Sequence, residues 1–222
     1  MNYSQTNDID LLELLLEEEG IELATDDVII SHPGLDQAPA SLQQRRLWFL
    51  YELEPTSSAY NICSIFCVQG LLNTRALQQS FQTLQERHES LRSTFIDIDG
   101  EPWQKIHPHA LTELVLQDWS GNTNTESTPE IAQIIAKISD SEGSHTFNLQ
   151  TGPLIRAGLF KLAPERHILT LTLHHIIADA WSMGVTLQEI AILYKLEITE
   201  QKIVLPELRF QYSDYALWQK EK

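Results

Sequence analysis

Cysteine is scarce in this sequence, and long apolar runs are missing. The 222 residues include only two cysteines, Cys63 and Cys67, which are too few for a disulfide framework. On an extended strand their side chains would point to the same face and could not easily bridge, so we expect reduced thiols in the core. No stretch approaches the 18 consecutive apolar residues of a membrane span, and the N-terminus lacks the basic and apolar regions of a signal peptide. We therefore expect a cytoplasmic protein.

Motifs that bind nucleotides or metals are also missing. The sequence contains neither a P-loop nor a GxGxxG pattern, so it offers no recognisable cradle for ATP or NAD. It contains no GxSxG nucleophile elbow and no CxxC or HExxH spacing that would indicate a metal site. We expect the chain itself to bind no cofactor and no metal. An enzyme of this kind would need a substrate that arrives already activated.

Lysine and arginine are outnumbered, since 15 basic against 31 acidic residues give a formal net charge of −16. This balance argues against a nucleic-acid partner, because neutralising phosphates requires clustered Lys and Arg. The first basic residue is Arg45, so the N-terminal segment is purely acidic. Leucines and acidic residues over residues 8–19 have amphipathic helical spacing, and Gly20 is a stop signal. Such a helix would either dock onto a basic partner surface or pack back on its own domain.

Helical and strand patterns alternate through the rest of the chain. Proline and glycine between residues 31 and 39 mark a linker, so we expect residues 1–37 to form an acidic leader, linker or docking segment and residues 38–222 to form the globular domain. The alternation predicts the α/β class, and hairpins such as the one around Asp99-Gly100 predict a mixed β-sheet with helices packed on it. Helices are expected near residues 41–53, 73–87, 131–138, 182–194 and 212–222, and strands near residues 61–69, 93–98, 103–106, 114–116, 154–162 and 167–173.

His174, His175 and Asp179 stand where an apolar strand ends and before the next helix begins. Reactive groups of α/β folds tend to lie at this edge of the sheet. Adjacent strand residues face opposite sides, so one imidazole should point into the protein and the other into a cleft, where it suits proton transfer near neutral pH. Asp179 lies close enough to orient the loop through an arginine or an imidazole. From the residues alone three interpretations stay open: two structural histidines, a His/His/Asp metal site, or a general base that orients the substrate.

Residues 174–182 resemble the HHxxxD active-site motif of the condensation domains of nonribosomal peptide synthetases, which are relatives of chloramphenicol acetyltransferase. Three other motifs of that family are matched in order. Residues 41–50 (SLQQRRLWFL) resemble SxAQxRLWxL, residues 87–95 (RHESLRSTF) resemble RHExLRTxF, and residues 212–218 (YSDYALW) resemble YxDFAVW. On these four motifs the chain is identified as a member of the family.

The resemblance implies a chloramphenicol acetyltransferase-like lobe. In the family the active site lies at the junction of two lobes of similar size. The last three family motifs would follow Trp218, so the chain is expected to correspond to the N-terminal lobe alone, preceded by an acidic helical leader, with the C-terminal lobe absent. A lobe of this kind is expected to be inactive by itself.

The resemblance also implies roles for the charged and polar residues of the motif. His175 would face the substrate channel and would position or deprotonate the acceptor amine, and His174 would be its inward structural partner. Asp179 would be buried and paired with Arg92, or alternatively with Arg87, because breaking a buried ion pair costs roughly 3–5 kcal/mol.

Three further residues of the motif receive structural roles. Ala180 replaces the glycine that is usual in the family, which is harmless if the backbone there is in an ordinary region and costs about 1 kcal/mol or more if φ is positive. Trp181 and Ser182 are expected to serve in packing and as a helix N-cap.

The implied reaction joins an acyl or peptidyl thioester to an aminoacyl thioester, each carried on the 4'-phosphopantetheine of a partner carrier protein. Other synthetase modules and, if it is encoded separately, a C-terminal lobe are further expected partners, with no nucleic acid and no membrane. Two other functions stay open. The chain could be a non-catalytic truncated remnant or docking protein, or a small-molecule acyltransferase that uses coenzyme A, although the first, second and fourth motifs weigh against the latter.

Overall fold

The computed structural model describes residues 28–109, 112–121, 128–199 and 205–222. Ser31–Lys222 form one compact unit, so the folded domain begins earlier than the predicted residue 38. The leader helix predicted over residues 8–19 lies outside the described residues. Within those residues no helix is long and apolar enough to cross a membrane.

The segment predicted as a linker is bonded into the domain. The backbone N–H of His32 donates to Oδ1 of Asp214 over 2.7 Å, and the carboxylate of Asp214 is almost fully buried. The carbonyl of Asp36 accepts from the N–H of Ile106 over 2.8 Å. Because a buried carboxylate oxygen needs a donor, the segment around His32 belongs to the fold.

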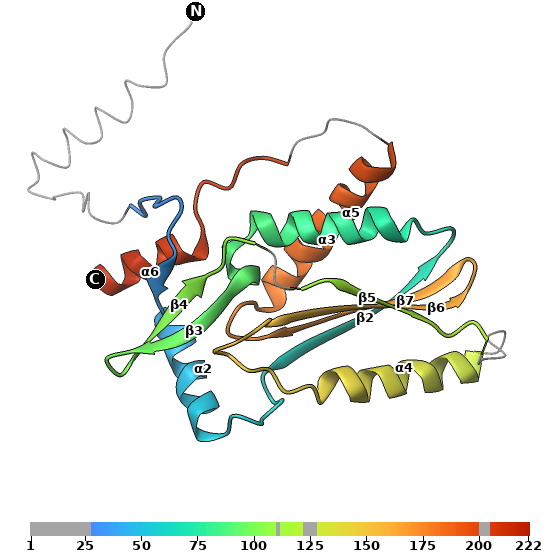
Figure 1. Cartoon of the computed structure of the whole chain (residues 1–222), viewed down its shortest axis with the longest axis horizontal. Helices are drawn as coiled ribbons and strands as arrows, with labels where there is room; N and C mark the ends of the chain where they lie inside the picture. Colours follow the sequence, from blue (N-terminus) through green and yellow to red (C-terminus); the bar gives the residue numbers. More distant parts are fainter. Residues whose placement is uncertain (1–27, 110–111, 122–127, 200–204) are drawn as a thin grey trace, which may run out of the picture. The chain divides into compact units, whose positions relative to one another are not determined.

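The larger sheet has four strands in the order β2-β7-β6-β5. β2–β7 and β7–β6 are antiparallel, whereas β5 runs parallel to β6, so the sheet is mixed as predicted. Helices α3 and α5 cover one face and α4 covers the other (Figure 1). The elements are β2 (Asn61–Gln69), α3 (Thr74–Arg87), β5 (Leu114–Asp118), α4 (Thr128–Gly143), β6 (Ile155–Ala163), β7 (Arg166–His174) and α5 (Ala180–Thr199).

Strand β7 alternates leucine with threonine, so that the two kinds of side chain point to opposite faces of the sheet. Leu171 and Leu173 join the core that α3 and α5 complete with residues such as Phe81. Thr172 faces the other side, where its hydroxyl donates to Glu142 of α4 over 3.2 Å. Every residue of β7 after Arg166 is buried, which is expected for a strand whose sheet is covered by helices on both faces.

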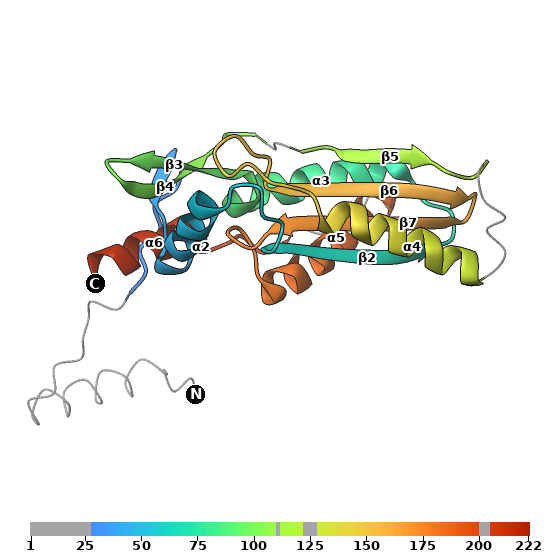
Figure 2. The same ribbon diagram turned by 90° about the horizontal axis from the view of Figure 1, so that it is seen from below.

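A second, three-stranded sheet was not anticipated. Its order is β1-β4-β3, all antiparallel, and Figure 2 shows it beside helices α2 and α6. The predicted turn is confirmed, with positive φ at Asp99 (55°) and Gly100 (83°), the backbone that a two-residue hairpin loop needs. The bounds are β1 (Gln37–Pro39), α2 (Leu42–Leu53), β3 (Ser93–Ile98), β4 (Glu101–Ile106) and α6 (Tyr212–Glu221), with a 3₁₀ turn at Glu89–Arg92.

Both cysteines are free thiols, but the expectation that they lie in the core is wrong. Cys63 is half-buried and Cys67 is exposed. Both belong to β2, which is the last strand on its side of the four-stranded sheet. An outermost strand is covered less completely than a central one, and its alternate residues can reach solvent.

Two truncations distinguish the predicted domain boundary from the observed one. We expect a polypeptide that starts at Ser31 to unfold at nearly the same urea concentration as the full chain, because the compact unit is intact. A polypeptide that starts at Gln37 should lose about 1–3 kcal/mol, because Oδ1 of the buried Asp214 loses the His32 N–H as its donor. Urea unfolding followed by tryptophan fluorescence measures both values. Equal midpoints for the two truncations would contradict a structural role for residues 31–36.

Candidate functional site

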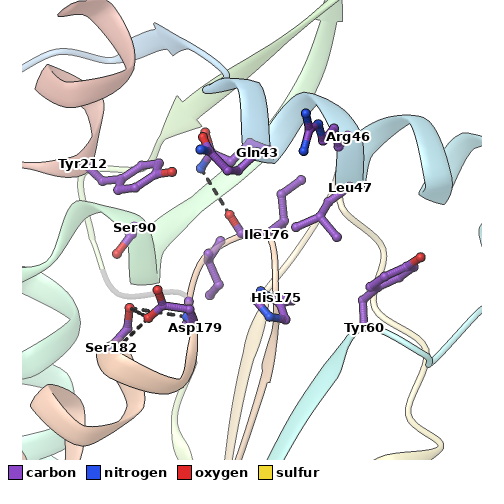
Figure 3. Close-up of a pocket in the computed structure, with 13 residues that line it drawn as sticks. Gln43, Arg46, Leu47, Tyr60, Ser90, His175, Ile176, Asp179, Ser182 and Tyr212 are labelled. Carbon is purple, nitrogen blue, oxygen red and sulfur yellow. Dashed lines mark hydrogen bonds between the residues drawn. The ribbon is translucent and has the colours of Figure 1, made fainter. Parts of the chain in front are cut away.

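A cavity of about 430 Å³ lies against the loop that joins β7 to α5 (Figure 3). Helix α2 forms one side of this cavity, the β7–α5 loop forms its floor, and the first turns of α5 and α6 complete the wall. The side chains and backbone around it belong to Gln43, Gln44, Arg46, Leu47, Tyr60, Ser90, His175, Ile176, Ile177, Ala178, Asp179, Ser182 and Tyr212.

His175 presents an exposed imidazole to this cavity. Its backbone N–H donates to the carbonyl of Tyr60 over 2.8 Å, which continues the pairing of β7 with the start of β2. The backbone at His175 is therefore fixed while its side chain stays accessible. This is the orientation that the sequence predicted for one of the two histidines.

His174 points the opposite way and is only 4% exposed. Its Nδ1 accepts a hydrogen bond from the backbone N–H of Ile176 over 3.1 Å. Burial, reinforced by the neighbouring His175, lowers the pKa of His174 from 6.5 to about 4. This hydrogen bond requires a neutral imidazole, because only an unprotonated Nδ1 can accept it. His174 therefore fixes the backbone of the loop, and its buried ring does not line the cavity.

Asp179 corrects one prediction. Its carboxylate is exposed, and Oδ1 accepts from the backbone N–H of Ser182 over 2.7 Å and from the Ser182 hydroxyl over 2.6 Å. These hydrogen bonds lower the pKa of Asp179, and the nearby His175 lowers it further. Asp179 is therefore the N-cap of α5, and the predicted buried ion pair with Arg92 is wrong.

Both candidate arginines have partners elsewhere. The Arg92 guanidinium donates to the carbonyl of His107 and lies 3.8 Å from the Glu89 carboxylate. Arg92 directly precedes β3, so the residue that follows the paired strand β4 is within easier reach than the β7–α5 loop. Arg87 instead bonds Glu189 of α5, with Nε 3.1 Å from Oε2.

The remaining motif residues also have defined places. Ala180 begins α5 and is not among the residues with positive φ, so alanine is unstrained where the family usually has glycine. Ser182 is the third residue of α5 and pairs with the cap, so the prediction that it is itself the N-cap is wrong. Trp181 is 82% exposed, which contradicts its predicted packing role within the described residues.

Sequence reasoning gave no role to several residues of the cavity wall, among them Tyr60, Ser90 and Tyr212. Tyr60, Ser90 and Tyr212 come from different segments, and only the fold brings them together. The hydroxyl of Tyr212 lies 2.9 Å from that of Ser41, and burial raises the pKa of Tyr212. Ser90 and Tyr212 lie inside the second and fourth motifs, so the resemblance pointed to their segments without giving them a role.

The described residues contain no group of three or more His, Cys, Asp or Glu side chains arranged to hold a metal ion. His174 and His175 point to opposite sides of the loop, and Asp179 is engaged by Ser182. The site therefore offers one exposed imidazole beside a carboxylate. This combination can orient a substrate and accept or release a proton.

Comparisons with known proteins place this geometry in context. The family model described as "Condensation domain" matches residues 35–222. A linear gramicidin synthase polypeptide of Brevibacillus parabrevis is 40% identical over 214 residues, which is 95% of this chain and 3% of that protein. The chain thus spans a small fraction of the length of this relative.

Two solved structures have the same fold. The structure described as the complex of the X-domain and OxyB from teicoplanin biosynthesis matches with a TM-score of 0.73 at 24% identity, over 87% of this chain and 40% of that one. The first condensation domain of the calcium-dependent antibiotic synthetase matches with a TM-score of 0.67 at 22% identity, over 78% and 40%. At these identities the likeness shows the fold alone.

The low pKa of His174 predicts a specific pH dependence of stability. Because the folded-state pKa is about 4 and the ordinary value is 6.5, the unfolded chain binds this proton first as the pH falls. The stability from neutral His174 is complete above pH 6.5 and is lost toward pH 4, by about 2 kcal/mol between pH 7.5 and 5. His174→Asn, whose amide oxygen can still accept the Ile176 N–H, should lose about 2 kcal/mol less over that interval in urea unfolding. Equal losses in both proteins would rule out the assignment.

A double-mutant cycle tests the corrected role of Asp179. Asp179→Ala should destabilise the fold by about 1 kcal/mol through the loss of the α5 cap. Its effect should add to that of Arg92→Ala within about 0.5 kcal/mol, because the two side chains share no bond. The matched cycle with Ser182→Ala should show coupling. A coupling energy above about 1 kcal/mol between Asp179 and Arg92 would instead support an ion pair between them.

Proposed function

The chain belongs to the condensation-domain family, and we propose that it contributes the histidine-bearing lobe of a site that forms amide bonds in nonribosomal peptide synthesis. The observation that carries the proposal is the division of the two histidines. His175 is exposed in a cavity of about 430 Å³, whereas His174 is buried and engaged by the loop backbone. The imidazole of His175 is available for chemistry, and the imidazole of His174 fixes the backbone that carries it.

The proposed reaction joins two thioesters carried by partner carrier proteins. The amine nitrogen of an aminoacyl thioester attacks the carbonyl carbon of an acyl or peptidyl thioester. The new C–N bond forms, the C–S bond breaks, and the proton lost by the amine is balanced by the proton that the departing sulfur gains as a thiol. His175 orients the amine and accepts or shares its proton as the tetrahedral intermediate forms. The thioester supplies the driving energy.

Asp179 supports this step indirectly. As the N-cap of α5 it fixes the end of the loop that bears His175, and the nearby His175 helps to lower the pKa of the Asp179 carboxyl group. Arg46 places a positive group at the cavity, and no hydrogen bond or ion pair engages its side chain within the described residues.

A polypeptide of residues 1–222 should need a second lobe for this reaction. It covers 40% of the matched condensation-domain chain, and its His175 is exposed. Catalysis by positioning depends on a bounded site in which reacting groups are held in place and water is excluded. We propose that a second lobe, supplied on the same polypeptide or on a partner, closes the cavity.

The test uses two carrier proteins loaded with donor and acceptor thioesters, and mass spectrometry detects the dipeptidyl thioester. We expect no product with residues 1–222 alone and product when a second lobe from a related condensation domain is supplied. His175→Ala should lower that turnover by at least about a hundredfold. His109→Ala, which changes an exposed histidine outside the cavity, should leave it unchanged.

Three outcomes would overturn parts of this proposal. Turnover by residues 1–222 alone that is lost in His175→Ala would disprove the need for a second lobe. Turnover that survives His175→Ala would disprove the role of this histidine. Absence of product with several second lobes and several donor and acceptor pairs would favour a docking protein without catalytic activity.

A further inference from the structure

Few hydrogen bonds tie the backbone of the loop that carries His175 to the rest of the domain, although Ile176, Ile177 and Ala178 pack in the core. Its backbone is tied to β2 through the His175 N–H and the Tyr60 carbonyl over 2.8 Å. Within the loop, His174 accepts from the N–H of Ile176, and its carbonyl accepts from the N–H of Ile177 over 3.1 Å. The carbonyl of Ile176, directly after His175, takes part in none of these bonds. The group that donates to this carbonyl therefore helps to fix the backbone next to His175.

That partner is Gln44 of α2, which is 2% exposed. Its side-chain Nε2 donates to the Ile176 carbonyl over 3.1 Å and to Oε1 of Gln104 over 3.2 Å. Its Oε1 accepts from the backbone N–H of Ser41 over 2.9 Å. Each hydrogen and the oxygen of the amide therefore has a partner, and the side chain joins the α2 cap, strand β4 and the loop.

The orientation of the Gln44 amide is fixed by a chain of acceptors. The Pro39 carbonyl can only accept, so the Gln104 amide must turn its Nε2 toward it, over 2.9 Å. Oε1 of Gln104 then faces Gln44 and requires its NH₂ group. The second hydrogen of that NH₂ group is directed to Ile176. Because both glutamines are buried, reversing either amide would leave acceptors facing acceptors, which costs the desolvation of each unpaired group.

We propose that Gln44 is a positioning residue for His175, which it holds toward the cavity through the Ile176 carbonyl. The proposal rests on the function assigned to His175 above. It goes beyond that function by giving a role to a residue of α2, far earlier in the sequence, that touches no reacting atom. Loss of the Gln44 donor should loosen the loop selectively while α2 and the sheet remain folded.

Gln85 of α3 provides a matched control. It is also buried, its Nε2 donates to the Thr112 carbonyl over 2.8 Å, and its Oε1 accepts from the Thr112 N–H over 3.2 Å. The two glutamines thus make the same kinds of bond to a loop backbone, but Gln85 has no hydrogen bond to the β7–α5 loop. Substituting either one should destabilise the fold to a similar degree, so stability alone cannot separate a general structural role from the proposed one.

Hydrogen exchange measured by mass spectrometry separates the two roles. In Gln44→Met, peptides covering residues 174–179 should exchange about tenfold faster or more than in the wild type, and peptides around Thr112 should be unchanged. Gln85→Met should give the reverse pattern. Gln44→Glu and Gln85→Glu form a second pair in case a methionine variant does not fold. Gln44→Glu keeps the oxygen that accepts from Ser41 and loses the donor to Ile176, so it should loosen the loop without fraying α2.

Kinetics of the domain completed with a second lobe give an independent readout. We expect Gln44→Met to lower kcat by about ten- to a hundredfold with little change in KM for the carrier-bound substrates, while Gln85→Met keeps the wild-type kcat. Unchanged exchange of residues 174–179 in both Gln44 variants would overturn the proposal, as would equal loosening of this loop by the Gln85 variants. The exchange experiment needs no turnover, so it can fail or succeed whether or not the chain supports condensation.

Discussion

The turn from strand β7 into helix α5 depends on the hydrogen bond that the buried imidazole of His174 accepts from the N–H of Ile176. Only a neutral ring can accept it, and burial keeps the ring neutral by lowering its pKa to about 4. With that bond in place, strand alternation directs the side chain of His175 toward the cavity, and Asp179 lies directly before the first turn of α5. The exposed group that suits chemistry is thus defined by a buried neighbour that performs none.

Much of the domain follows from local sequence patterns. Helix α2, strand β2 and the Asp99-Gly100 hairpin were all predicted, because helical spacing, strand alternation and turn preferences act over a few residues. Opposite orientations for His174 and His175 followed from strand geometry in the same way. What could not be predicted was the second sheet, since β1 is only three residues long and its partner β4 lies far away in the sequence.

The predicted Arg92–Asp179 pair shows where motif position is a poor guide to contact. Arg92 and Asp179 belong to neighbouring motifs, but Arg92 meets the His107 carbonyl beside it, and Asp179 meets Ser182 three residues on. A flexible charged side chain takes the partner that its own backbone brings near. Other contacts do join distant motifs, such as the 2.7 Å bond from the Ser213 hydroxyl to Glu89, and no periodicity in the sequence would indicate them.

The Asp179 cap has a consequence for the electrostatics of the cavity. A helix of 20 residues such as α5 carries the equivalent of about half a positive charge at its N-terminus, and this end borders the cavity. The Asp179 carboxylate neutralises that partial charge and occupies the Ser182 N–H. An oxyanion that develops on a thioester carbonyl in this cavity would therefore gain little from the α5 dipole. Its negative charge must be balanced by donors that come from other elements.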